Sequence, residues 1–291
     1  MSHTDSRART AARQRERSAA LRARQQAARR RRLAAVAAAT TIVVITAALL
    51  VTRMITGGQG TAATTGAEPG VIAEVTHVPA TVLDAVGAGQ GASGPTPITG
   101  APALTTAGKP RIVYLGAEYC PYCAAERWAV VQALSRFGTF SGLGQTRSAA
   151  ADVYPNTATL SFHGATYSSA YLVFDGYEQQ SNQRAGGSYA PLDPVPADVT
   201  QLAGTYGQGG IPFVDLGGAA VINGADYSPS LLAGKSQAQI AAALSDASSP
   251  IAKAVLGEAN RISATLCTLT GGQPGAVCRS AGVQAAAHAR G

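Results

Sequence analysis

The chain has 291 residues, 46% of them hydrophobic, which is enough to bury a sizeable core in one large domain or two small ones. Its net charge of +7 is uneven, because residues 1–32 hold eleven Arg against only Asp5 and Glu16 and so carry +9. The remaining residues, 33–291, therefore carry −2, and the basic balance of the whole chain does not indicate a nucleic-acid-binding domain. We expect no nucleic-acid partner.

An apolar stretch, 33–55, follows the basic segment and is long enough to cross a bilayer. It has no charged residue before Arg53. A secretory signal peptide has a shorter apolar core and a small-residue cleavage site, so we expect an uncleaved transmembrane helix with the lipid bilayer as its partner. The Arg cluster predicts a cytoplasmic tail at 1–32 and an extracytoplasmic domain anchored in the cytoplasmic membrane. Binding of DNA or of a protein by the tail is the alternative.

Three segments of different composition come next. Residues 56–70 are mostly Gly, Thr and Ala, which predicts a flexible linker. Apolar residues in 71–86 predict the first strand and turn of a domain that extends over 71–280. Residues 87–110 are rich in Gly, Pro, Ser and Thr, so we expect a loop with a short helix around Ala101–Thr106.

The next stretch combines a buried strand with a pair of cysteines. Ile112–Leu115 has the length and composition of a buried strand, and a helix is expected from the cysteines to about Phe137. Cys120 then lies at the start of that helix, where free backbone N–H groups favour a thiolate and should lower its pKa. Cys120 is the expected attacking thiol, and Cys123 is expected to resolve the mixed disulfide. Pro121 suits an early helix position because its missing N–H is not needed there.

A Cys-x-x-Cys motif alone has three interpretations: half of a zinc site, a structural bridge or a redox pair. The intervening Pro121-Tyr122 is the dipeptide of glutaredoxins. Downstream, Ile211-Pro212 begins a predicted hairpin with a Gly-Gly turn. In thioredoxin-like folds a cis-proline at the head of such a strand lies against the cysteine motif and presents backbone to substrate, the role expected of Pro212 and Ile211.

Other side chains near the motif have less specific interpretations. Trp128 is expected to pack in the core. Glu118 and Glu126 are expected to be solvated surface carboxylates, with proton relay as the alternative. Thioredoxin has a buried Asp six residues before its first cysteine; Tyr114 occupies that position here, so that base is absent.

Residues 138–210 are predicted to be an insertion near the active site, either shaping a substrate groove or packed as a decoration. Thr157–His163 and Ala170–Phe174 are expected to pair as strands. His163 is expected to be structural. The four His are scattered at positions 3, 77, 163 and 288, so no metal cluster is predicted.

The C-terminal part is predicted to be helical and to hold a second cysteine pair. Ser236 and Gln239 match a capping box, and Ser249-Pro250 should begin a longer helix. Four cysteines allow three pairings; the simplest joins Cys120 to Cys123 and Cys267 to Cys278. We expect the second bridge to be structural, with a second redox pair as the alternative. The tail at 281–291 is expected to be disordered.

Several of these motifs together resemble a known family. They are Gly116–Trp128, Asp152–Thr157, Gly210–Asp215 and Leu266–Pro274 leading to Cys278. Over roughly residues 75–280 the chain is similar to membrane-anchored thioredoxin-like proteins known as domain of unknown function 929. The resemblance implies a thioredoxin-like α/β fold and an extracytoplasmic location, but no substrate.

The sequence thus predicts one transmembrane helix followed by a thioredoxin-like mixed sheet with flanking helices. The expected activity is thiol–disulfide exchange on protein thiols and disulfides, without a bound cofactor and with an unidentified redox partner. The direction of electron flow stays open. The first alternative is a non-catalytic, membrane-tethered binding or scaffold domain whose cysteine pairs are structural disulfides. The second is a zinc or copper site, which would have to recruit all four cysteines.

Overall fold

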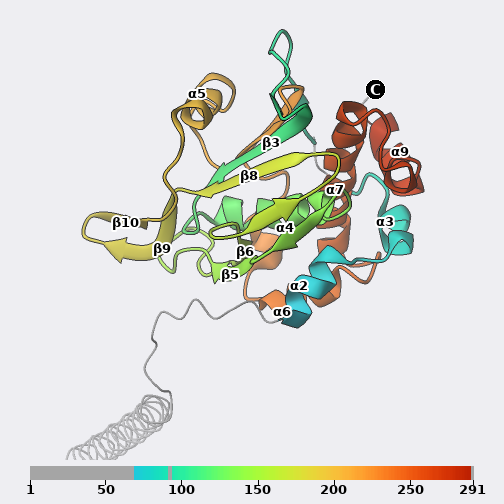
Figure 1. Cartoon of the computed structure of the whole chain (residues 1–291). Coiled ribbons are helices and arrows are strands. Elements are labelled where there is room, and N and C mark those ends of the chain that lie inside the picture. Colours follow the sequence, from blue (N-terminus) through green and yellow to red (C-terminus); the bar gives the residue numbers. More distant parts are fainter. Residues whose placement is uncertain (1–68, 91–93, 290–291) are drawn as a thin grey trace, which may run out of the picture. The chain divides into compact units, whose positions relative to one another are not determined.

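The computed structural model describes residues 69–90 and 94–289. The predicted tail at 1–32, the predicted transmembrane helix at 33–55 and most of the predicted linker at 56–70 lie outside these residues. Among the described helices, none has both the length and the apolar composition that a bilayer crossing requires. The described part forms a mixed α/β domain (Figure 1).

A mixed sheet forms the centre of this domain (Figure 1). Its strands, in spatial order, are β1 (Thr96–Pro97), β12 (Ala220–Asn223), β11 (Phe213–Leu216) and β3 (Lys109–Gly116), with β2 (Thr105–Thr106) and β8 (Val173–Glu178) also paired to β3. β8 runs parallel to β3, whereas the other pairs are antiparallel. The predicted strand at Ile112–Leu115 and the predicted hairpin after Pro212 are therefore confirmed.

The described helices are α2 (Pro69–Thr76), α3 (Ala80–Val86), α4 (Pro121–Leu134), α5 (Ala197–Tyr206), η1 (Pro229–Leu232), α6 (Gln237–Ala243), α7 (Pro250–Leu269), α8 (Gly275–Cys278) and α9 (Ala281–His288). Helices α4 and α7 pack on one face of the central sheet and α5 on the other. Alternation along β3 sends Ile112 and Tyr114 into a large core that includes α4 and α7. Val113 and Leu115 point to the opposite face, into a smaller core with α5.

Two helix starts have the caps that the sequence predicts. At α6 the Ser236 hydroxyl accepts the Gln239 N–H at 3.2 Å, and the Gln239 side chain accepts the Ser236 N–H at 2.9 Å. At α7 the Ser249 hydroxyl accepts the Ile251 N–H at 3.2 Å. Both arrangements satisfy N–H groups that the first helical turn leaves free.

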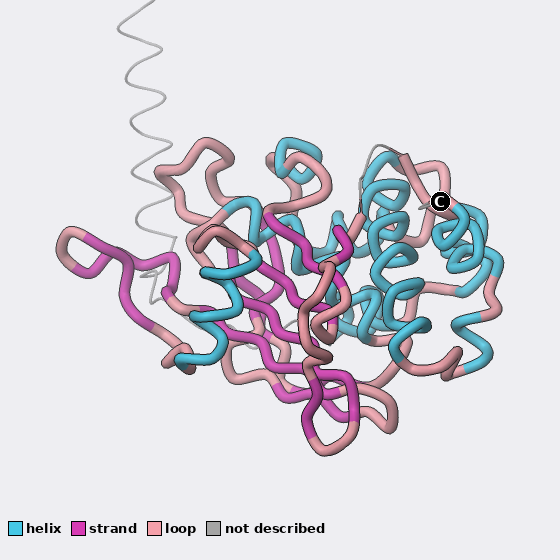
Figure 2. The backbone as a smooth tube through the Cα atoms, turned by 90° about the horizontal axis from the view of Figure 1, so that it is seen from above, coloured by secondary structure: helices cyan, strands magenta, loops and turns pink. Residues whose placement is uncertain are grey.

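The segment 138–210 is not one insertion, which corrects the prediction. Its small paired strands are β4 (Thr139–Ser141) with β7 (Thr166–Ser168), β5 (Gly144–Arg147) with β6 (Ala158–Ser161), and β9 (Gln180–Ala185) with β10 (Ser188–Pro191). However, β8, between β7 and β9, joins the central sheet, and α5, after β10, packs on one face of that sheet. Figures 1 and 2 show the β9–β10 hairpin extending away from the body of the domain.

The predicted pairing of Thr157–His163 with Ala170–Phe174 is wrong. β6 pairs with β5, while β8, which begins within the second segment, pairs with β3. In the central sheet β8 is covered on both faces, because Phe174 packs against the large core and Tyr177 against the smaller one. An isolated hairpin would not bury both side chains.

The predicted first strand in 71–86 is also wrong, because this segment forms α2 and α3. Val71 and Val75, four residues apart, share one helix face and are buried in the large core. The short helix expected around Ala101–Thr106 is absent from the described residues there; instead Thr105 and Thr106 pair with the start of β3.

The predicted disordered tail at 281–291 is contradicted as far as residue 289, since α9 occupies most of it. Small side chains let α9 approach its neighbours closely. The Gly282 N–H donates to Asp84 at 2.8 Å, and Val283 and Ala286 are buried. A segment of small residues can therefore form a packed helix when tight contacts are available.

Candidate active site

Cys120 lies where β3 leads into α4. It is the N-cap residue of α4, and its Sγ accepts the Cys123 N–H at 3.2 Å. Pro121 and Tyr122 form the first positions of the helix, as expected. Both cysteines are free thiols. The predicted placement of an acceptor sulfur at a helix start is therefore confirmed.

The two thiols differ in environment. Cys120 is 6% exposed and Cys123 is 0% exposed. The hydrogen bond with the Cys123 thiol lowers the pKa of Cys120, and the Cys123 N–H and the charge of Arg127 act in the same direction against burial. Burial raises the pKa of Cys123 well above its usual value, and the neighbouring Cys120 adds to this. Cys120 is therefore the thiol that ionises first.

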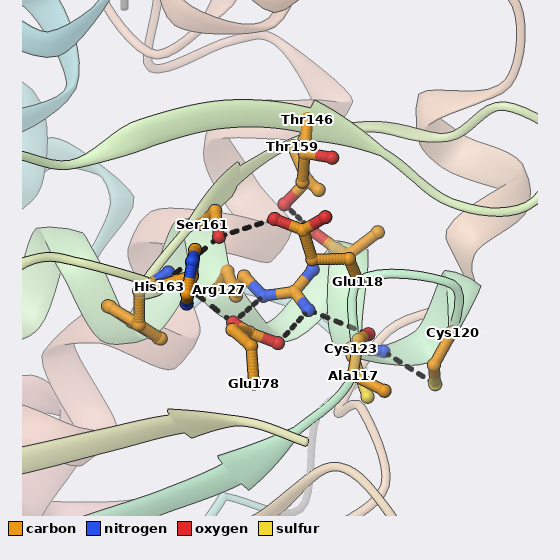
Figure 3. A network of polar contacts seen from close by, with 12 residues as sticks. Ala117, Glu118, Cys120, Cys123, Arg127, Thr146, Thr159, Ser161, His163 and Glu178 are labelled. Carbon is orange, nitrogen blue, oxygen red and sulfur yellow. Dashed lines mark hydrogen bonds and ion pairs between the residues drawn. The ribbon is translucent and has the colours of Figure 1, made fainter. Parts of the chain in front are cut away.

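A fully buried ion pair lies next to the cysteines (Figure 3). Arg127 Nε donates to Glu178 Oε1 at 2.7 Å, and Nη2 donates to Oε2 at 2.6 Å. Nη2 also donates to the Ala117 carbonyl at 2.7 Å. Burial raises the pKa of Glu178, and the charge and hydrogen bonds of Arg127 oppose that rise. Burial also disfavours the charge of Arg127, but the attraction of Glu178 keeps the pKa of Arg127 high. The two-point contact favours the ionised pair.

Polar contacts link this pair to His163, which is exposed and is labelled in Figure 3. The Glu178 N–H donates to Asp193 Oδ2 at 2.9 Å, and Asp193 Oδ1 lies 2.6 Å from His163 Nδ1. The Ser161 hydroxyl donates to Glu118 at 2.7 Å. His163 is thus tied to a carboxylate at the edge of the site, and Glu118 is partly buried rather than freely solvated.

The β9–β10 hairpin and the loop after β5 both contact the residues just before Cys120. The Glu118 N–H donates to the Gln180 carbonyl and the Ala149 N–H donates to the Tyr119 carbonyl, each at 2.9 Å. The rings of Tyr119 and Tyr189 stack 4.2 Å apart. The β9–β10 hairpin and the loop after β5 therefore flank the cysteine motif.

Tyr122, between the cysteines, is 41% exposed and packs edge-on against Tyr154, with ring centroids 5.9 Å apart. Tyr154 belongs to the segment between β5 and β6. The outer surface beside Cys120 is therefore partly aromatic.

Pro212 directly precedes β11 and is buried, and the Ile211–Pro212 peptide bond is cis. The register pairs Phe213 with Leu115, near the end of β3. Since the chain continues from that end of β3 to Cys120, Pro212 lies at the same end of the sheet as the cysteine motif. Ile211 packs against the smaller core.

The surface position expected for Glu126 is wrong. Its side chain is fully buried, and both carboxylate oxygens have no hydrogen-bond partner in the described part of the chain. Burial raises the pKa of Glu126 well above its usual value, and the charge of Asp226 adds to this. Burial likewise raises the pKa of Glu258 on α7. The prediction failed because α4 is packed on all sides, so no face of this helix is left for a solvated carboxylate. Trp128, as predicted, is fully buried.

The second cysteine pair forms the predicted disulfide, Cys267–Cys278, with Cα atoms 5.5 Å apart. It lies at the far end of α4 from Cys120. Arg136, two residues beyond α4, donates to the Ser280 hydroxyl at 3.1 Å, and Ser280 is two residues after Cys278. Because α4 has 14 residues, or about 20 Å, between these ends, the two pairs cannot exchange directly.

The same separation contradicts a metal site built from all four cysteines. Within residues 69–90 and 94–289, no three His, Cys, Asp or Glu side chains are grouped so that they could hold a metal ion.

No role for Arg127 or Glu178 was predicted from the sequence. One signal was present: Arg127 is four residues after Cys123 and so lies on the same face of α4. Glu178 had no local signal, because its contact depends on β8 lying beside β3.

Comparison with known proteins gives one match. The family model described as domain of unknown function (DUF929) matches residues 99–268. This range is narrower at both ends than the resemblance in the sequence suggests. No curated protein and no solved structure matched the chain. The family match covers more than half of the sequence, and the chain therefore belongs to the DUF929 family.

Proposed function

We propose that this protein is a membrane-anchored, extracytoplasmic thiol–disulfide oxidoreductase with a thioredoxin-like fold. The strand order β12–β11–β3–β8 supports the fold, with α4 following β3, α5 following β8 and α7 following β12. A Cys-x-x-Cys motif at the start of the first of these helices is the arrangement in which such folds perform exchange.

The observation that carries the proposal is the asymmetry of the two thiols. Cys120 accepts hydrogen bonds at a helix start and is slightly exposed, whereas Cys123 is fully buried one turn further on. A pair of structural thiols has no need of a difference in pKa. An exchange pair needs a difference in pKa, because the attacking sulfur must be a thiolate while the second sulfur stays protonated until the mixed disulfide has formed.

In the reducing direction the proposed exchange takes place in two steps. The Cys120 thiolate attacks one sulfur of a substrate disulfide; a new S–S bond joins Cys120 to the substrate, and the other substrate sulfur leaves as a thiolate. Cys123 then loses its proton and attacks Cys120, which forms the Cys120–Cys123 disulfide and releases the second substrate thiolate. Two electrons pass to the substrate. The oxidising direction is the reverse.

Pro212 and Ile211 are the proposed substrate-positioning residues, together with Pro121 and Tyr122 between the cysteines. They gather at the end of the sheet where β3 leads to Cys120. The exposed Tyr122 would contact an approaching polypeptide. The proposed location outside the membrane rests on the basic segment 1–32 before the apolar segment 33–55, and the Cys267–Cys278 bridge suits an oxidising compartment.

Trapping of the mixed disulfide tests the proposal. A Cys123→Ser variant of the full chain, mixed with a disulfide-bonded peptide, should accumulate a covalent Cys120–peptide adduct, because the resolving thiol is missing. The matched Cys120→Ser variant should form none. Failure of Cys123→Ser to form the adduct, in a protein with unchanged circular dichroism, would leave the scaffold alternative as the better account.

A further inference from the structure

The buried pair of Arg127 and Glu178 bears on the direction of electron flow, which the cysteine motif alone leaves open. We propose that Arg127 is a positioning residue whose cation faces the thiols and favours their reduced, thiolate form, so that the protein donates disulfides. This inference rests on the proposed exchange function.

Arg127 shares a hydrogen-bond acceptor with the backbone of Cys120. The Ala117 carbonyl accepts two hydrogen bonds, one from Arg127 Nη2 at 2.7 Å and one from the Cys120 N–H at 3.2 Å. Arg127 is therefore one hydrogen-bonding group away from the backbone of the attacking cysteine. Figure 3 shows its guanidinium between Glu178 and the segment that carries the cysteines.

Glu178 and Arg127 differ in how fully their hydrogen-bonding groups are used. Glu178 is occupied: both of its oxygens accept from Arg127, and Oε1 also lies 3.4 Å from the Phe162 N–H. A carboxylate held in this way is a poor acceptor for a thiol proton. Arg127 Nη1, in contrast, is buried and has no hydrogen-bond partner among the described residues. In this ion pair, therefore, it is Arg127 and not Glu178 that has a free hydrogen-bonding group.

The charge of Arg127 acts on both thiols. The charge of Arg127 lowers the pKa of both cysteines, as a smaller contribution than the hydrogen bond at Cys120 and the burial of Cys123. The residue on β3 beside this pair is Tyr114, which is neutral because burial raises its pKa well above the usual value. A cation that stabilises a thiolate stabilises the reduced pair relative to the disulfide, which has no charge to stabilise.

In the proposed direction the oxidised pair accepts two electrons from two substrate thiols. The substrate disulfide forms, the Cys120–Cys123 bond breaks, and the two protons go to Cys123 and to solvent or Cys120. Re-oxidation requires an oxidised disulfide carrier, which accepts the two electrons in a second exchange. Oxidised glutathione serves as that carrier in the test below.

The test compares oxidation equilibria in glutathione buffers, read by alkylation and mass spectrometry on the full chain. In Arg127→Met/Glu178→Met both charges are replaced by apolar groups, a change that buried pairs often tolerate. The equilibrium constant for forming the Cys120–Cys123 disulfide should rise at least about tenfold, or about 30 mV toward a more reducing pair. The Cys120 pKa, from the pH profile of alkylation, should rise with it. Arg127→Lys keeps the cation and should stay within about threefold of wild type.

Arg136 provides the matched control, since it is a partly buried arginine just beyond the other end of α4 that donates to Asn260 and Ser280. Arg136→Met should change stability but neither the equilibrium constant nor the Cys120 pKa. An unchanged equilibrium constant in the double variant would overturn the role of Arg127 while leaving exchange intact.

If the double variant does not fold, the same titration of the wild-type chain tests the inference. In a buffer whose redox potential lies in the range of glutaredoxins, more than half of the Cys120–Cys123 pair should be reduced. A wild-type pair that is mostly oxidised there contradicts the inference. A pair that does not exchange at all contradicts the proposed function instead.

Discussion

The two cysteine pairs lie toward opposite ends of α4 and differ in bonding and surroundings. Cys120 and Cys123 are free thiols at the start of α4, beside a buried ion pair and between the β9–β10 hairpin and the loop after β5. Cys267 and Cys278 are joined beyond its other end, where α7, α8 and α9 meet. The comparison teaches that the number of cysteines says little about redox chemistry, whereas their hydrogen bonds and neighbouring charges say much.

The largest expected effect comes from removing the attacking thiol. Cys120→Ser should lower the rate of disulfide exchange with a peptide substrate at least about 1,000-fold, because a serine hydroxyl is not ionised at neutral pH. The double variant Cys267→Ser/Cys278→Ser should stay within about threefold of wild type in the same assay. A large loss in the second variant would break the comparison, since it would give the distant pair a part in exchange.

Stability should respond in the opposite order. Loss of the Cys267–Cys278 bridge should lower the free energy of unfolding by about 2–3 kcal/mol, because the bridge closes a short loop of the unfolded chain. Urea unfolding of Cys267→Ser/Cys278→Ser, with reduced wild-type protein measured alongside, gives this value. Replacing Cys120 by Ser should cost less than about 1 kcal/mol, since the Ser hydroxyl can still accept the Cys123 N–H at the start of the helix.

The two thiols of the first pair should also differ in reactivity. At pH 7, iodoacetamide should modify Cys120 at least about tenfold faster than Cys123 in the reduced protein. The rate at Cys120 should level off at a pH below about 8.5, the usual pKa of a cysteine. Site-resolved mass spectrometry against pH measures both. Equal rates, or a plateau at Cys120 above that pH, would remove the observation on which the proposed function rests.

An effect on stability alone is expected in the middle of α4. Glu126 has a folded-state pKa raised by burial, so the folded protein holds a proton there that the unfolded chain loses above about pH 4.3. Its contribution to stability is therefore present at low pH and falls as pH rises toward the raised pKa. Glu126→Gln should remove this loss, so the variant should gain about 1–2 kcal/mol over wild type at pH 8 and nothing at pH 4. Exchange activity should not change.

Much of the fold follows from local sequence patterns. The strand at Ile112–Leu115, the helix that begins after Cys120 and the hairpin after Pro212 each have a local signal, and each is present. Helix α2 was missed although Val71 and Val75 have helical spacing, because two short apolar runs fit a strand equally well.

The charged part of the candidate site could not be predicted in the same way. Arg127 and Glu178 are 51 residues apart in sequence and meet only because β8 pairs in parallel with β3. Glu126 was misplaced because acidic residues on helices are usually solvated. Both errors concern charges whose surroundings are set by packing between distant elements, which no local pattern contains.

One redox titration tests the central claim, since it follows both cysteine pairs in the same full-length protein. Samples equilibrated in glutathione and dithiothreitol buffers are alkylated and resolved by mass. The account predicts that Cys120–Cys123 opens between about −200 and −120 mV, while Cys267–Cys278 stays closed to below about −300 mV. An opening near −270 mV would keep the exchange function but contradict the role of Arg127. A Cys120–Cys123 pair that also stays closed below about −300 mV would contradict the claim that this pair performs disulfide exchange. Both pairs would then be structural disulfides.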